Sequence, residues 1–202
     1  MTKIKLCGLT TERDIESANA VVPEYIGFVF ASESRRHVAR EKAAELKKML
    51  DPGIKAVGVF VNEDPQTAAL LLNENVIDLA QLHGNEDEEY IRYLKTLTRK
   101  PLIKAFRISS KEDILKACCC TADYVLFDSG AGTGEVFDWD LIKDFRKQYF
   151  LAGGLSPDNV SMAVNILHPY AVDVSSGIET NGIKDRKKME RFAAAKRALM
   201  NK

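Results

Sequence analysis

The chain has 202 residues, enough for one domain or two small ones with a sizeable buried core. Its 29 lysines and arginines balance its 29 aspartates and glutamates, so the formal net charge is zero. Without a large electrostatic field, neither a nucleic acid nor an anionic membrane surface is an expected partner. Nothing at the N-terminus resembles a signal peptide, and no apolar run approaches the ~20 residues that cross a bilayer.

Apolar runs rich in β-formers recur along the chain, and charged segments with helical periodicity separate them. The expected strands cover residues 3–7, 25–30, 55–60, 76–83, 102–107, 124–128, 149–153 and 171–175. The expected helices cover residues 12–20, 39–50, 65–73, 86–97, 111–119, 139–147, 157–166 and 184–200. Thr10 or Thr11 can cap the first helix, and Asp64 and Ser156 are expected caps because each precedes a proline.

This order gives eight β/α units of about 25 residues each, near the short end of the range for a (β/α)8 barrel. Strands that alternate with helices imply parallel pairing and right-handed crossovers. The sequence therefore predicts an α/β protein whose residues 1–202 form a single-domain (β/α)8 TIM barrel. A doubly wound open sheet is the alternative, but it usually has fewer strands, and no GxGxxG follows any strand here.

The four cysteines indicate a reducing compartment, and the protein is expected in the cytoplasm. Cys118, Cys119 and Cys120 are consecutive, and adjacent cysteines pair poorly with one another. No CxxC or Cys/His ligand spacing is present. We interpret the three cysteines as small apolar filling on a helix.

Counting back by twos from each strand end predicts which side chains face the barrel axis. The predicted inward pairs are Lys5 with Cys7, Gln81 with His83, Lys104 with Phe106, Leu126 with Asp128, and Asp173 with Ser175. Buried charges are costly unless they are paired, so the two lysines and two aspartates of this set are expected to form a network. Polar residues gathered at strand ends predict the floor of a site.

Cys7 ends the first strand and Asp128 ends the sixth, so they are expected near opposite sides of the barrel mouth. A thiol and a carboxyl group that face each other across a pocket can act as a general acid/base pair. Nearby Lys5 is expected to favour the thiolate. The alternatives are a buried, inert cysteine and an aspartate that caps a helix or forms an ion pair.

Two loops predict a phosphate site. LAGGLS, with Gly153 and Gly154, follows the seventh strand, and DVSSG, with Ser175, Ser176 and Gly177, ends the eighth. Such barrels usually bind phosphate there, because backbone N–H groups and a helix N-terminus point at the anion. Otherwise these glycines only make tight turns.

Other polar residues near strand ends leave more than one interpretation open. Arg35 or Arg36 could receive a carboxylate in bidentate geometry, although an arginine pair is more often a solvated loop. His83 is expected either to contact a ligand or to be hydrogen-bonded at the mouth. It shares no metal-ligand spacing with the other two histidines, so no metal site is expected. Three glycines, at 130, 132 and 134, predict a loop that could act as a lid.

The ordered set KIKLCGLT, GFVFASESRRH, GVFVN, QLHG, IKAF, LFDSGAGTGEVFDW, LAGGL and AVDVSSGIE resembles the phosphoribosylanthranilate isomerase family of tryptophan biosynthesis. The match covers nearly the whole chain, with a motif at every expected strand end. The resemblance implies an Amadori rearrangement that needs neither metal nor cofactor. The aminoaldose N-(5-phosphoribosyl)anthranilate becomes the aminoketose 1-(2-carboxyphenylamino)-1-deoxyribulose 5-phosphate.

The resemblance also implies roles for individual residues. Cys7 corresponds to the general base and Asp128 to the general acid, while Arg36 would hold the anthranilate carboxylate. The loops at 153–154 and 175–177 would hold the phosphate. The expected partner is a small-molecule phosphosugar, bound by a monomer or a homodimer. Further contacts with this substrate are expected from Gln81, His83 and Asp173.

Other functions remain open at this point. The related histidine-pathway isomerase would need an aspartate where Cys7 stands and a second phosphate loop, whereas GVFVNEDP and QLHGNED carry acidic loops. A metal-dependent pentose-phosphate epimerase would need inward His and Asp ligands on several strands. A non-catalytic phosphosugar-binding barrel is the alternative from another class, and a turnover assay separates it from an enzyme.

Overall fold

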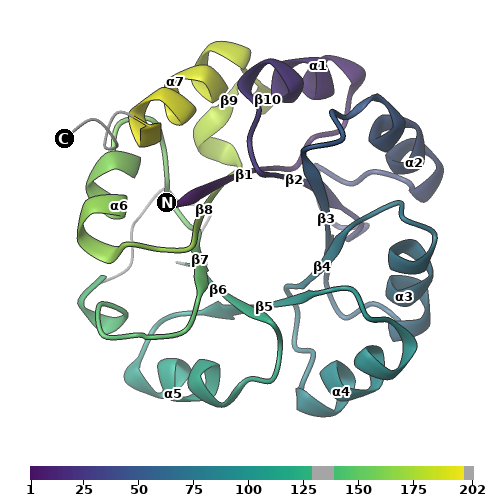
Figure 1. Ribbon diagram of the computed structural model, residues 1–202, viewed down its shortest axis with the longest axis vertical. Helices are drawn as coiled ribbons and strands as arrows, with labels where there is room; N and C mark the ends of the chain where they lie inside the picture. The colour runs from purple at the N-terminus through teal and green to yellow at the C-terminus, as the bar shows by residue number, and fades with distance from the viewer. Residues whose placement is uncertain (129–138, 198–202) are drawn as a thin grey trace.

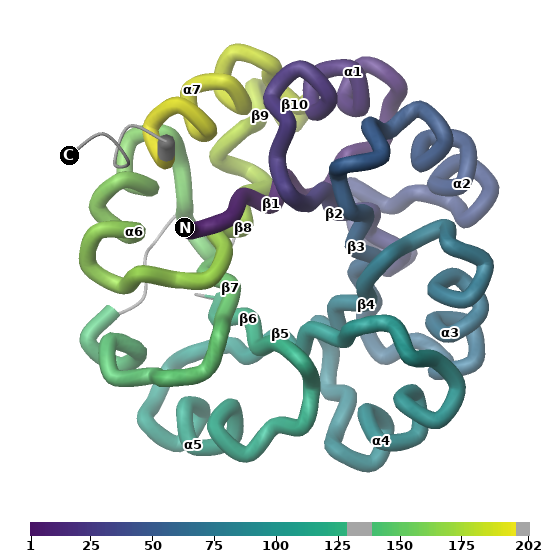
Figure 2. Tube along the Cα trace, viewed as in Figure 1, coloured from purple at the N-terminus to yellow at the C-terminus, as the bar shows by residue number. Residues whose placement is uncertain are grey.

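The computed structural model describes residues 1–128 and 139–197. Eight parallel strands form a closed barrel in the order β1 to β8, and β8 pairs with β1 (Figure 1). The helices surround the ring of strands, and the chain advances around that ring one strand at a time (Figure 2). The predicted (β/α)8 barrel is confirmed. The barrel strands are β1 Lys3–Cys7, β2 Tyr25–Val29, β3 Lys55–Phe60, β4 Leu79–Leu82, β5 Leu102–Arg107, β6 Tyr124–Asp128, β7 Tyr149–Leu151 and β8 Ala171–Val174.

The helices are α1 Glu12–Val21, α2 Arg40–Met49, α3 Pro65–Asn73, α4 Glu88–Leu97, α5 Lys111–Cys119, α6 Val160–Leu167 and α7 Arg186–Arg197. Two helix starts carry the expected caps. Thr11 forms a capping box with Asp14 at the start of α1, and Asp64 accepts a hydrogen bond from Gln66 N ahead of α3. None of the helices within 1–128 and 139–197 has the length and apolarity needed to cross a membrane.

The helix expected over 139–147 is wrong. Only a short 3-10 helix, η1 Trp139–Leu141, forms there, and Phe145 N then bonds to Ile142 O. The apolar residues Trp139, Ile142 and Phe145 recur every three positions, the period of a 3-10 helix rather than an α-helix. Phe145 packs edge-on against Phe127 of β6, with ring centroids 4.8 Å apart. An aromatic contact thus covers this part of the barrel in place of a helix.

The cap predicted at Ser156 begins a turn and not a helix. Ser156 Oγ accepts from Asp158 N at 3.2 Å, and Asn159 Oδ1 accepts from Ser156 N at 2.8 Å. Helix α6 therefore begins at Val160, three residues later than Pro157 suggested. The turn keeps the backbone after β7 close to the barrel mouth.

The last helix also begins later than expected, because a hairpin precedes it. Strand β9 (Glu179–Thr180) pairs antiparallel with β10 (Ile183–Lys184), following the 3-10 helix η2 (Ser176–Ile178). The two turn residues, Asn181 and Gly182, have φ values of 53° and 80°. An Asn-Gly pair with positive φ at both positions is the preferred two-residue hairpin turn. Residue 184, predicted to start the helix, lies in this hairpin instead.

The core has two layers. A large outer layer fills the space between strands and helices, and a smaller inner layer fills the barrel. The inner layer includes Ile103 and Ala105 of β5, so Lys104 faces the opposite way. The prediction that Lys104 and Phe106 face the barrel axis is therefore wrong. Lys104 Nζ lies in the outer layer, 2.9 Å from a carboxylate oxygen of Glu86.

Candidate active site at the barrel mouth

A cavity of about 600 Å³ lies at the carboxyl ends of the barrel strands. All of the predicted site residues except Gly177 line it: Cys7, Arg36, Gln81, His83, Asp128, Gly153, Gly154, Asp173, Ser175 and Ser176. A second hollow, of about 850 Å³, is lined by Asn73, residues 95–100 and Asp123, and it contains none of them. The first cavity is therefore the candidate site.

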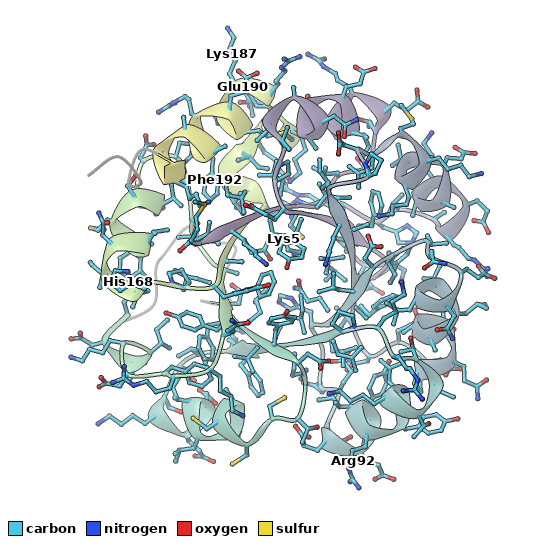
Figure 3. All side chains as sticks on the ribbon, viewed as in Figure 1. Lys5, Arg92, His168, Lys187, Glu190 and Phe192 are labelled. Carbon is cyan, nitrogen blue, oxygen red and sulfur yellow. The ribbon has the colours of Figure 1, made fainter. Side chains whose placement is uncertain are left out.

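A buried ion pair forms the floor of this cavity. The register of β1 and β8 places Lys5 beside Asp173, and Lys5 Nζ lies 2.7 Å from Asp173 Oδ2. The Lys5 side chain is fully buried near the centre of the barrel, as Figure 3 shows. Burial on its own lowers the pKa of Lys5, but the charges of Asp173 and Cys7 outweigh it, so the pKa is raised. The predicted network is confirmed for this pair.

The Cys7 thiol lies above the Lys5–Asp173 pair, at the end of β1. Burial raises the pKa of this thiol above its ordinary value, and the nearby charges of Lys5 and Lys184 oppose that rise. A Cβ atom at Gly27 on the neighbouring strand would lie only 2.6 Å from Cys7 Sγ. Gly27 therefore provides the space that the thiol occupies.

A chain of polar groups runs along the opposite wall. Gln81 Nε2 lies 2.8 Å from His83 Nδ1, and His83 Nε2 lies 3.2 Å from Asp128 Oδ2. When Gln81 Nε2 donates to Nδ1, the imidazole is neutral and its Nε2–H donates to Asp128. His83 is therefore hydrogen-bonded at the mouth, and it also lines the cavity, while its contact with a ligand stays a prediction.

The loops after β7 and β8 meet at one side of the mouth. Gly153 and Gly154 have φ values of 83° and 64°, a conformation that glycine adopts without strain. Gly177 packs against the residue that follows them, because a Cβ atom there would lie 2.0 Å from Leu155 O. Ser175 Oγ donates to Cys7 O at 3.1 Å. Close backbone contact thus holds the two predicted phosphate loops together and against β1.

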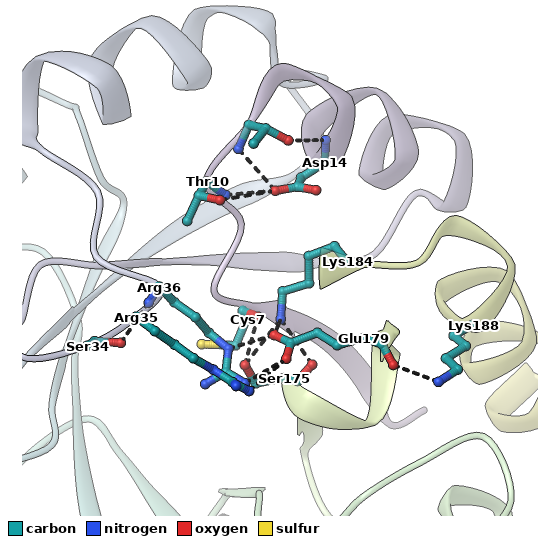
Figure 4. A network of polar contacts seen from close by, with 11 residues as sticks. Cys7, Thr10, Asp14, Ser34, Arg35, Arg36, Ser175, Glu179, Lys184 and Lys188 are labelled. Atoms are coloured by element: carbon teal, nitrogen blue, oxygen red, sulfur yellow. Dashed lines mark hydrogen bonds and ion pairs between the residues drawn. The ribbon is translucent and has the colours of Figure 1, made fainter. Parts of the chain in front are cut away.

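Arg36 is held by a carboxylate that the sequence did not predict. Its Nε and Nη2 atoms donate to the two carboxylate oxygens of Glu179 at 2.6 and 2.8 Å (Figure 4). Lys184 Nζ donates to Glu179 Oε1 at 2.6 Å, and Arg35 Nη2 to Glu179 Oε2 at 3.1 Å. Burial would raise the pKa of Glu179, but hydrogen bonds from Arg36 and Lys184 lower it to about 2. Only the motif AVDVSSGIE and the Asn-Gly turn signalled these residues.

Three further predictions concern the glycine-rich loop, metal ligands and the cysteines. Gly130, Gly132 and Gly134, predicted to form a loop with a possible role as a lid, lie outside the described residues. Over residues 1–128 and 139–197, no group of three or more His, Cys, Asp or Glu side chains could hold a metal ion. The cysteines in those ranges are all free.

Residues 4–195 match the family model described as N-(5'phosphoribosyl)anthranilate (PRA) isomerase. A relative of that name from Endomicrobium trichonymphae is 46% identical over 194 residues, covering 94% of this chain and 95% of the relative. The chain belongs to the PRA isomerase family. It is therefore an isomerase of tryptophan biosynthesis with a TIM-barrel fold.

Solved PRA isomerases have the same overall fold as this chain. The structure of the enzyme from Thermotoga maritima superimposes with a TM-score of 0.88 at 33% identity, covering 98% of this chain and all of that one. A further PRA isomerase structure, in complex with reduced 1-(o-carboxyphenylamino)-1-deoxyribulose 5-phosphate, has a TM-score of 0.87 at 33% identity. In both comparisons the similarity covers 98% of this chain.

Proposed function

We propose that the chain catalyses the Amadori rearrangement of N-(5-phosphoribosyl)anthranilate, with Cys7 as general base and Asp128 as general acid. The observation that carries this proposal is a single cavity lined by a thiol from β1 and a carboxyl group from β6. The phosphate loops and Arg36 line the same cavity. A related isomerase structure that holds a reduced form of the reaction product supports this choice of substrate.

Asp128 begins the reaction by donating a proton to the ring oxygen of the ribose. The ring opens, and the nitrogen lone pair forms a Schiff base with C1. His83 Nε2 lies 3.2 Å from Asp128 Oδ2, and that hydrogen bond orients the carboxyl group for proton transfer. Ring opening produces the Schiff base, from which Cys7, on the opposite wall, removes a proton in the next step.

Cys7 then removes the proton from C2 as a thiolate. The resulting enolamine tautomerises to the ketone as C1 is protonated, which completes the aldose–ketose conversion. Burial disfavours the thiolate, and the cationic Lys5 below it compensates in part. Because Lys5 is itself paired with Asp173, it can supply this charge without leaving the barrel floor.

The two ends of the substrate are held apart. The loops at 153–154 and 175–177 bind the phosphate through backbone N–H groups, and Arg36 binds the anthranilate carboxylate. Fixing both ends places C2 beside Cys7 and the ring oxygen beside Asp128, which converts binding into orientation. Gln81, His83 and Asp173 complete the contacts below the ribose.

The test is the fluorescence decay of freshly generated phosphoribosylanthranilate. Wild type is expected to accelerate the decay, and Cys7→Ala and Asp128→Ala to lose the acceleration. Cys7→Ser should lose most of the turnover as well, because a serine hydroxyl, unlike a thiol, does not ionise near neutral pH and supplies no comparable base. Cys118→Ser, at an exposed cysteine, is the matched control and should behave like wild type. Near-normal kcat in Cys7→Ser would overturn the assignment of the base.

The alternatives predict different outcomes. A histidine-pathway isomerase would leave this substrate unchanged and act on its bis-phosphate counterpart. A non-catalytic barrel would bind phosphosugars without turnover. We further propose that the enzyme acts in the cytoplasm, in keeping with its free cysteines, as a monomer or a homodimer. One solved PRA isomerase, from Thermotoga maritima, is described as dimeric.

A further inference from the structure

The β9–β10 hairpin places two opposite charges at the edge of the candidate site. Glu179 and Lys184 are direct partners across the hairpin, and each side chain is only 4% exposed. Burial lowers the pKa of Lys184, and Glu179 opposes that effect. Buried charges of this kind are stable only when they are paired and hydrogen-bonded. The proposed chemistry uses neither residue, so their burial requires another explanation.

Glu179 occupies one edge of the Arg36 guanidinium. The hydrogen bonds involve Nε and Nη2, the side-on edge of the group, and none within the described residues involves Nη1. A guanidinium presents a second bidentate edge, formed by Nη1 and Nη2. That edge is the one left for a ligand in the cavity that Arg36 lines.

Arg36 cannot easily turn to offer any other edge. Glu179 accepts from Arg35 and Lys184 as well as from Arg36, so its own position is fixed from three sides (Figure 4). On the other side of Arg36, a Cβ atom at Gly8 would lie 2.4 Å from Arg36 Cδ. The guanidinium is therefore confined between the β1 loop and the hairpin.

We propose that Glu179 is a positioning residue that orients Arg36, so that its outer edge selects a substrate with a carboxylate on the aromatic ring. This inference rests on the proposed function and adds the device by which the site distinguishes anthranilate from an uncharged aryl group. An arginine left free to swing would receive the carboxylate in several orientations and would place C2 less precisely beside Cys7.

Lys184 connects the Glu179–Arg36 pair to the loop after β8. Its Nζ donates to Ser175 O at 3.0 Å and to Ser175 Oγ at 3.2 Å, besides Glu179. Ser175 Oγ in turn donates to Cys7 O at 3.1 Å. These hydrogen bonds therefore link Glu179, which holds Arg36, to the phosphate loop after β8 and to the strand that carries Cys7. The separation between the two ends of the substrate is fixed by these links.

The experiment compares two substrates in wild type and Glu179→Gln. The first is phosphoribosylanthranilate, and the second is its aniline counterpart, which lacks the carboxylate. In Glu179→Gln, kcat/KM for the first should fall on the order of 10- to 100-fold, the effect of misplacing a substrate by about 1 Å. For the aniline compound it should change less than about twofold, because that compound never uses Arg36. Arg36→Ala should also lose kcat/KM for phosphoribosylanthranilate and keep it for the aniline compound. The double variant Glu179→Gln/Arg36→Ala should have a kcat/KM for phosphoribosylanthranilate little below that of Arg36→Ala.

The matched control is Glu190→Gln, which removes a glutamate that pairs with Arg186 on the exposed face of α7. Its kcat/KM for each of the two substrates should equal that of wild type. Equal losses on the two substrates in Glu179→Gln, or no loss on either, would overturn the positioning role. If Glu179→Gln does not fold, Glu179→Gln/Lys184→Met removes both buried charges together and is judged by the same selectivity.

Failure of the proposed function would look different. If wild type turns over neither compound, the function is wrong, and the positioning role is then read from binding. The reduced product analogue should bind Glu179→Gln about tenfold more weakly than wild type, a loss of about 1.4 kcal/mol. Its aniline counterpart should bind both proteins equally. Equal binding of the carboxylate analogue to both proteins would refute the role of Glu179.

Discussion

Replacing Lys5 by methionine tests the ion pair on which the candidate site is built. The variant keeps a long apolar side chain in the barrel but leaves the Asp173 carboxylate without its cation at 2.7 Å. The two side chains are 0% and 7% exposed, so water can solvate the carboxylate only weakly once the lysine is gone. Breaking a buried pair from one side typically costs 3–5 kcal/mol. We expect a loss of about that size in the free energy of unfolding, measured by urea denaturation.

The double-mutant cycle separates the pair from simple loss of packing. Asp173→Asn should also be destabilised, because it leaves the buried Lys5 ammonium without a carboxylate. Lys5→Met/Asp173→Asn removes both charges, so its loss should be well below the sum of the two single losses. Lys116→Met, which breaks an exposed pair with Glu112, should cost well under 1 kcal/mol. Additive losses in the Lys5–Asp173 cycle would refute the reasoning.

The same variants test the electrostatics of Cys7 in opposite directions. The Lys5 charge lowers the pKa of the thiol and the Asp173 charge raises it, although burial dominates. Lys5→Met should therefore slow alkylation of Cys7 at pH 8, and Asp173→Asn should speed it. Mass spectrometry of the tryptic peptide that carries Cys7 separates it from the exposed Cys118 and Cys119. Equal rates in both variants would show that Lys5 does not act on the thiol.

Two further predictions concern the loops around the mouth. In Gly177→Ala, the new Cβ would lie 2.0 Å from Leu155 O, so the two phosphate loops must separate, and KM for the phosphosugar should rise about tenfold in steady-state assays; an unchanged KM would refute the close contact. The pKa of Glu179 is lowered to about 2 from an ordinary 4.5. A carboxyl group whose pKa is lower in the folded state stabilises fully above its unfolded pKa, and that contribution is lost as pH falls through its folded pKa. The free energy of unfolding of wild type should therefore fall from about pH 4.5 towards pH 2, and in Glu179→Gln it should fall less over this range. Parallel pH curves for the two proteins would contradict the prediction.

The sequence was sufficient for the order of the strands and for most residues of the cavity, because both depend on local pattern. Strand ends in a parallel barrel meet at one face, so residues such as Cys7 and Asp128 could be placed there without coordinates. Inward and outward facing was less certain, because a shift of one residue in the assumed strand end reverses it. Lys104 shows this: the expected strand and β5 both end at Arg107, and counting back from that residue instead of Phe106 gives Ile103 and Ala105, the residues that face inward.

Contacts between distant segments could not be predicted in this way. Glu179 lies 143 residues from Arg36 along the chain, and nothing near either residue indicates that they meet. The Asn-Gly turn at 181–182 was a local signal for the hairpin that brings Glu179 and Lys184 to the mouth, but a helical pattern beginning at Lys184 overlapped it. Competing local patterns therefore concealed the element on which the geometry of Arg36 depends.

The charges of the mouth explain how a substrate with two anionic ends could bind in one orientation. Lys5 is neutralised by Asp173, while Arg36 and Lys184 share Glu179. The segments 153–156 and 175–177 contain no lysine or arginine, so any phosphate there would be bound by their backbone N–H groups and serine hydroxyls. If the cations near Arg36 were unpaired, they would compete with these loops for the phosphate, which carries more charge than a carboxylate. Glu179 offsets one of the three positive charges of Arg35, Arg36 and Lys184, which weakens that competition, and it leaves the outer edge of Arg36 for a planar carboxylate.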